Sequence, residues 1–193
     1  GGYWPYKAIN LDEYLIKLCH PVGRYNIKLF GNSNWPVTQY CGRIASENVG
    51  ALFASATVSP NISEPHSQDF GYDIIERPFK VLMSGGFCIS DYVESMANDV
   101  FTNGEIVFAK TPKEFKTLVE YYIKNPLERF QHIQTGYQSV VKNHTYFDLA
   151  LDIDNFFREN NISDACLLGH SMGGKAAMLF DLLFPNLLST LII

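Results

Sequence analysis

The chain has 193 residues, of which 47% are hydrophobic and 18% are charged, and its formal net charge is −5. This composition is typical of a folded globular protein and excludes a mainly disordered one. Lys and Arg are dispersed without a basic cluster, which argues against nucleic-acid binding because neutralising phosphates requires grouped cations. No apolar run is long enough to cross a bilayer, so the sequence predicts no membrane association.

The four cysteines lie far apart, at Cys19, Cys41, Cys88 and Cys166, and form no C-x-x-C pair. This spacing predicts neither a zinc site nor a disulfide framework, and we expect no metal and no cofactor. Reduced thiols indicate a cytoplasmic protein. The first residue is Gly1 and not Met, and the last lies in a strand-like run, so the sequence is expected to be a fragment at both ends.

Apolar periodicity in residues 1–146 predicts strands that alternate with helices, which indicates an α/β fold with a mainly parallel sheet. Pro and Gly in a polar stretch predict a long loop over residues 61–72. On the last predicted helix of this part, the residues expected to face inward are Phe130, Ile133, Tyr137, Val140 and Val141. The expected helices are 10–18, 46–53, 77–84, 112–124 and 126–142, and the expected strands are 25–30, 56–59, 87–90 and 105–108.

Residues 147–193 carry a second pattern of helix, strand, helix and strand, predicted over 148–160, 165–168, 171–184 and 188–193. The G-x-S-x-G motif Gly169-His170-Ser171-Met172-Gly173 lies between the first strand and the helix that follows it. Such a strand-to-helix turn exposes a serine oxygen and aims backbone N–H groups at a developing oxyanion. Ser171 is therefore a candidate nucleophile, and the Met172 N–H is a candidate oxyanion donor.

This segment resembles the nucleophile-elbow segment of α/β-hydrolase esterases. In that fold the catalytic acid and histidine follow the serine along the chain. After Ser171 the only acid is Asp181, and no histidine follows. The resemblance therefore implies a partial hydrolase unit, because a serine hydroxyl without a base is a poor nucleophile.

The stretch from Phe70 to Asp91 predicts a helix that starts near Arg77 and Lys80 and ends at the diglycine Gly85-Gly86, before a short buried strand. Cations at the start of a helix favour a diphosphate site. The alternative from the residues alone is a surface helix with solvated charges.

The helix–diglycine–strand unit, together with Asn125-Pro126-Leu127-Glu128-Arg129 and His144-Thr145-Tyr146, resembles the donor-binding C-terminal domain of GT-B glycosyltransferases of the spore-maturation-protein-like group. The resemblance implies a Rossmann-like domain that binds a nucleotide-sugar donor, with the acceptor-binding domain missing. It places Gly1 and Gly2 near the donor phosphates, and Arg77, Gly85 and Gly86 at the donor site. Lys80 stands near where many relatives have a glutamate that binds the donor ribose.

Three interpretations follow, with expected domains at residues 1–146 and 147–193. The chain is a glycosyltransferase-like domain that binds a donor, a serine hydrolase with Ser171 as nucleophile, or an inactive fusion of two fragments. The residues alone leave all three open.

Overall fold

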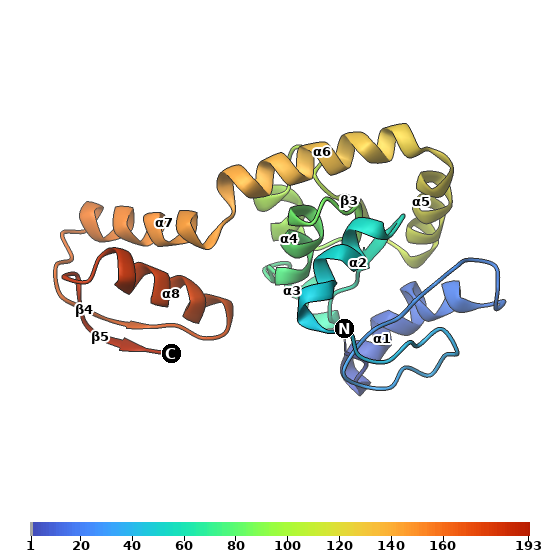
Figure 1. Ribbon diagram of the computed structural model, residues 1–193, viewed down its shortest axis with the longest axis horizontal. Helices are drawn as coiled ribbons and strands as arrows, with labels where there is room; N and C mark the ends of the chain where they lie inside the picture. The colour runs from blue at the N-terminus through green and yellow to red at the C-terminus, as the bar shows by residue number, and fades with distance from the viewer. Residues whose placement is uncertain (1) are drawn as a thin grey trace. The chain divides into compact units, whose positions relative to one another are not determined.

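The computed structural model describes residues 2–193, and Gly1, which was expected in the donor-binding loop, lies outside them. The chain forms two compact units, Gly1–Gln138 and Ser139–Ile193. The division falls inside helix α6 (Pro126–Asn143), earlier in the chain than the expected boundary after residue 146. Figure 1 shows the elements of each unit.

The first unit contains a three-stranded parallel sheet in the order β1-β2-β3. Its strands are β1 (Ser59–Asn61), β2 (Cys88–Asp91) and β3 (Val107–Ala109). All four residues of the central strand β2 are fully buried, as expected for a parallel sheet covered on both faces. The predicted α/β class with a parallel sheet is therefore confirmed for this unit.

Helices connect and flank these strands. Several of them begin at a proline, which is tolerated in the first turn because the missing N–H would have no partner there. In chain order they are α1 (Pro5–Tyr14), α2 (Val49–Ser55), α3 (Pro65–Phe70), α4 (Glu76–Met83), α5 (Pro112–Lys124) and α6. Short 3-10 turns at Ile16–Cys19 and Ser46–Asn48 and a π-helical turn at Met96–Val100 complete the unit.

The diglycine ends helix α4. Gly85 has φ +72°, a left-handed conformation that favours glycine. The Gly86 N–H donates to the Val81 carbonyl at 2.9 Å, and the Gly85 N–H donates to the Leu82 carbonyl at 2.9 Å. This pair of bonds is a Schellman motif, which satisfies the last carbonyls of the helix before the chain enters β2.

The core of the first unit joins α1 and α5 to the sheet. Phe115 of α5 is fully buried, and its ring centroid lies 5.7 Å from that of Tyr14 in an edge-on arrangement. Phe87, immediately before β2, packs against the Tyr122 ring at 4.8 Å. Phe115, Val119 and Tyr122 of α5 therefore all face the core.

Three expectations for this unit were wrong. The strand expected over residues 25–30 is reduced to a single bridge between Leu29 and Tyr40, where the Leu29 N–H donates to the Gln39 carbonyl and the Cys41 N–H donates to the Leu29 carbonyl. The loop expected over 61–72 contains helix α3, which Pro65 begins and the left-handed Gly71 ends. On α6, Val140 is buried, but Phe130 is 54% exposed and Tyr137 and Val141 are each 46% exposed.

The second unit has the predicted order of helix, strand, helix and strand. These elements are α7 (Tyr146–Glu159), β4 (Ala165–Leu168), α8 (Met172–Leu183) and β5 (Leu188–Ile192), and the two strands are parallel. A capping box between Thr145 and Asp148 begins α7. Phe157 of α7 packs edge-on against Phe180 of α8, with ring centroids 5.1 Å apart.

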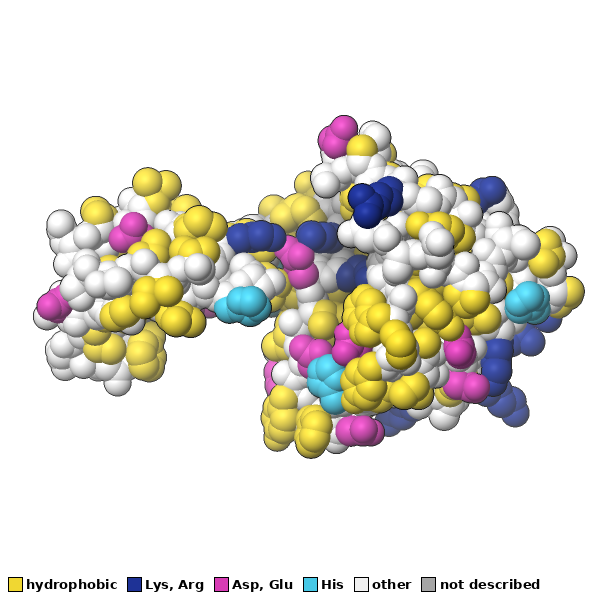
Figure 2. Space-filling view, turned by 90° about the horizontal axis from the view of Figure 1, so that it is seen from below, with side chains coloured by type: hydrophobic (Ala, Val, Ile, Leu, Met, Phe, Trp, Pro, Cys, Tyr) yellow, Lys and Arg dark blue, Asp and Glu magenta, His cyan; other side chains and the backbone are white. Residues whose placement is uncertain are grey.

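On the face of the molecule in Figure 2, Lys and Arg side chains lie in separate small groups and do not form one continuous basic surface. Of the helices within residues 2–193, none combines the length and apolarity needed to cross a membrane.

Candidate functional site

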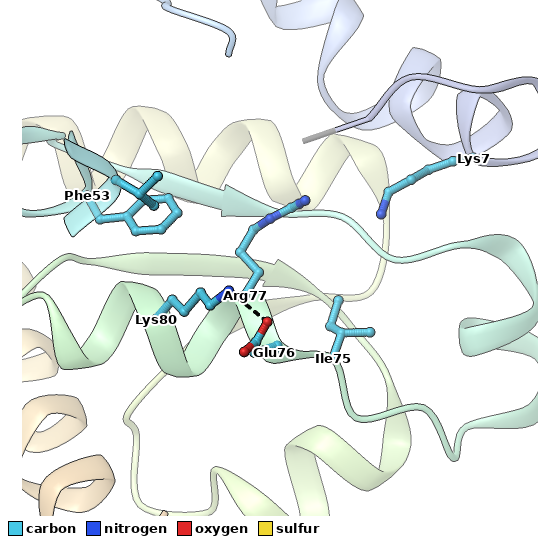
Figure 3. Close-up of a pocket in the computed structure, with 7 residues that line it drawn as sticks. Lys7, Phe53, Ile75, Glu76, Arg77 and Lys80 are labelled. Carbon is cyan, nitrogen blue, oxygen red and sulfur yellow. Dashed lines mark ion pairs between the residues drawn. The ribbon is translucent and has the colours of Figure 1, made fainter. Parts of the chain in front are cut away.

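The first unit has a pocket at the N-terminal end of helix α4. Because α4 leads into the start of β2, its own first turn lies toward the carboxyl ends of the parallel strands. In open α/β sheets this edge is where ligands bind. The pocket, drawn in Figure 3, is lined by Lys7, Val49, Phe53, Ile75, Glu76, Arg77 and Lys80.

Arg77 lies on the first turn of α4, is half-buried, and points into this pocket. Among residues 2–193 its guanidinium has no hydrogen-bond or ion-pair partner. Burial lowers the Arg77 pKa, and Asp91 and Cys88 are the groups that oppose this shift. The Cys88 thiol is neutral at physiological pH, because burial raises its pKa to about 12. Arg77 therefore presents a positive charge to the pocket without a bonded counter-ion.

Lys80, the other cation expected at this helix, is in a different situation. Its ammonium lies 2.7 Å from Glu76, one turn earlier on α4, and both side chains line the pocket. Lys80 is exposed, with 53% of its side chain accessible to solvent. Much of its charge is therefore offset locally, so Arg77 is the better anion contact of the two.

Lys7 is a pocket residue that the sequence interpretation missed. It lies on α1, far from Arg77 in sequence, yet it lines the same pocket. Only 7% of Lys7 is exposed to solvent. Burial lowers its pKa, and the charge of Arg77 lowers it further. The sequence does contain a signal for the burial of Lys7. The buried face of α1 consists of residues at helical spacing: Lys7, Asn10, Leu11 and Tyr14.

A buried carboxylate organises the edge of the sheet beside this pocket. Asp91, the last residue of β2, is fully buried and accepts hydrogen bonds from the Ser63 backbone N–H at 2.9 Å and from Gln68 Nε2 at 2.7 Å. The Ser63 and Ser90 hydroxyls lie at 3.1 and 3.3 Å. Burial raises the Asp91 pKa against the effect of these donors.

This network reaches the helix that carries Lys7. The side-chain amide of Asn10 donates to the Ser63 carbonyl at 3.1 Å, and Ser63 is also held by Asp91. Asn10 lies one turn after Lys7 on α1. The Asp91 network therefore fixes α1 against β2, and with it the position of Lys7.

The predicted glycines lie elsewhere. Gly85 and Gly86 follow the last turn of α4, at the end of the helix opposite to Arg77, and do not line the pocket. Gly2 precedes α1 and packs closely against the Trp4 ring. The Lys7 ammonium lies over the same ring, 5.1 Å from its centroid. A role for these glycines in donor binding stays a prediction.

The G-x-S-x-G turn of the second unit has the backbone of a strained elbow. Ser171 has φ 55° and ψ −112°, an unusual conformation for a residue other than glycine. Gly169 is buried, and a Cβ there would lie 2.6 Å from the Gly173 carbonyl oxygen, so only glycine allows the strand and helix to approach this closely.

The elbow exposes the serine but supplies no base. Met172 is the first residue of α8, where a free N–H is expected. Ser171 is exposed, and within residues 2–193 its hydroxyl has no hydrogen-bond partner. Ser171 is therefore an exposed serine in a strained backbone conformation, and no described side chain activates its hydroxyl.

The first unit thus combines a parallel α/β sheet with a cationic pocket at the carboxyl edge, as in Rossmann-like domains. A comparison with known families agrees with this class: the profile described as "Glycosyl transferase-like" matches residues 15–154, well over half of the chain. The chain belongs to this glycosyltransferase-like family. The match extends into α7. No curated protein and no solved structure matches the chain significantly.

Proposed function

We propose that the first unit binds the nucleotide-sugar donor of a glycosyltransferase in the pocket at the start of α4. The observation that carries this proposal is Arg77, a half-buried guanidinium without a bonded partner among the described residues. It lies on the first turn of a helix at the carboxyl edge of the sheet. A guanidinium binds phosphate oxygens in pairs, and the helix N-terminus adds free N–H groups and a favourable dipole.

In glycosyl transfer the nucleoside diphosphate leaves as the sugar moves to its acceptor, so a group that holds the diphosphate also stabilises the leaving group. The proposal for this chain is donor binding. The resemblance to two-domain glycosyltransferases implies that the acceptor is presented by a separate acceptor-binding domain.

Calorimetric titration of the full chain with UDP- and GDP-sugars tests the proposal. We expect binding of at least one donor, and we expect Arg77→Met to weaken it about 10- to 100-fold, because charge-assisted contacts contribute about 1.5–3 kcal/mol. Lys17→Met is the control, since Lys17 is exposed, pairs with Glu13 and lies outside the pocket. Absence of binding heat with every donor would contradict the proposal.

A second candidate function rests on Ser171. We infer from its strained backbone and from the close approach at Gly169 that this turn is an α/β-hydrolase elbow. A fluorophosphonate probe tests whether it is active. Labelling that is lost in Ser171→Ala but kept in Ser163→Ala, a change at another exposed serine, would support a serine hydrolase. An unlabelled wild-type chain would reject this function.

A further inference from the structure

We propose that Lys7 and Arg77 together form one binding site for a diphosphate, with Lys7 contributing a second cation from helix α1. This inference rests on the proposed donor-binding function and names a contact residue that neither the motif nor the family match identifies. The two residues lie on α1 and α4, and both line the same pocket. In Figure 3 the Lys7 ammonium and the Arg77 guanidinium point toward one another across it.

No acid within the described residues forms an ion pair with either cation. Asp91 is the carboxylate that acts on both, but its oxygens already accept the bonds from Ser63, Gln68 and Ser90. Glu64 and Asp73 also act on Lys7 from a distance. Their oxygens lie near the two nitrogens of His66, at 3.7 and 3.8 Å.

The burial of Lys7 is costly for the fold. An ammonium group removed from water requires a compensating negative charge. The Lys7 ammonium instead lies near the positive charge of Arg77, which repels it. The Trp4 ring offsets only part of this cost. A buried, unpaired lysine beside an arginine is therefore unfavourable for stability alone, and an anionic ligand between them removes the repulsion.

The chemistry of the pair favours phosphate oxygens. Arg77 offers a planar fork of donors, whereas Lys7 offers a compact charge, and the two suit neighbouring phosphates of one diphosphate. The same two cations would also bind free pyrophosphate. The experiment must therefore distinguish a nucleotide's diphosphate from free pyrophosphate.

The test compares wild type, Lys7→Met and Lys17→Met by calorimetry with UDP, GDP, pyrophosphate, inorganic phosphate and uridine. Methionine keeps the unbranched length of lysine and can still pack against Trp4. We expect Lys7→Met to weaken binding of UDP or GDP and of pyrophosphate about tenfold or more, while Lys17→Met binds as wild type does. We also expect the Lys7→Met melting temperature to equal or exceed that of wild type, because a costly buried charge is gone.

The outcomes separate this inference from the proposed function. Equal binding of UDP or GDP by wild type and Lys7→Met would overturn the role of Lys7 while leaving donor binding in place. Binding of pyrophosphate but of neither nucleotide, again lost in Lys7→Met, would support the anion site and contradict the nucleotide-sugar function. Loss of binding with a lowered melting temperature would overturn the inference, because Lys7 would then have a structural role.

Discussion

The Asp91→Ala variant is expected to unfold with a free energy about 3 kcal/mol lower than that of wild type. The change removes the acceptor for the Ser63 N–H and the Gln68 amide, which are then left without a partner beside the fully buried strand β2. Because Ser63 also anchors Asn10, the change should loosen α1 as well. Urea denaturation followed by circular dichroism measures the difference.

The size of this effect should depend on pH. Burial raises the Asp91 pKa, so the folded state binds the proton more tightly than the unfolded state does. The stability that Asp91 contributes is therefore fully present below the unfolded pKa of about 4 and declines as pH rises through the folded value. We expect the loss in Asp91→Ala to be larger at pH 4 than at pH 7. A loss of unfolding free energy in Asp91→Ala that increases from pH 4 to pH 7 would contradict the buried environment described for Asp91.

The Phe115→Ala variant is expected to lose about 4 kcal/mol of unfolding free energy. Phe115 is fully buried between α5 and α1, where its ring meets Tyr14 edge-on, and the truncation leaves a cavity. The change therefore tests whether α1, which carries Lys7, belongs to the core of the first unit.

Phe130→Ala is the matched control for this prediction. Phe130 lies on α6 and is 54% exposed, so the same truncation should change the unfolding free energy by less than about 0.5 kcal/mol. Chemical denaturation monitored by tryptophan fluorescence compares the two variants, since Trp35 belongs to the core that contains Phe115. Equal losses in both variants would contradict the packing described for α5.

The predicted elements agree best with the structure where the sequence carries strong local signals, such as a proline at the start of a helix. Pro112 begins α5 and Pro126 begins α6, as the expected ranges have it, and the repeating apolar positions of α5 face the core. Prediction failed where the outcome depended on distant partners. The strand expected over 25–30 has the composition of a strand, but a ladder requires a neighbour, and only Leu29 forms a bridge.

The candidate site was predictable in part for the same reason. Arg77 could be found from sequence because helix, cation and diglycine follow one another along the chain. Lys7 could not be assigned to the same pocket, since its approach to Arg77 depends on how α1 packs against the sheet. The family resemblance implied that Gly85 and Gly86 lie at the donor site, and helix α4 places them at the end opposite to Arg77.

The elbow illustrates a different limit. Gly169, Ser171 and Gly173 encode a local turn, and the structure has the strained serine that such a turn requires. Catalysis by a serine also requires a base from elsewhere, and the sequence after Ser171 contains no histidine. The motif therefore predicts the backbone conformation of this turn, but it does not by itself predict catalytic activity.

We propose that the pocket at the start of α4 holds the diphosphate of a nucleotide. Two-dimensional amide NMR of the 15N-labelled full chain during titration with UDP and with GDP tests it most directly. We predict that the largest shifts with at least one nucleotide lie at the amides of Lys7, Glu76, Arg77, Phe79 and Lys80, with little change at Ser171. Shifts confined to the second unit, or no shifts with either nucleotide, would contradict the claim.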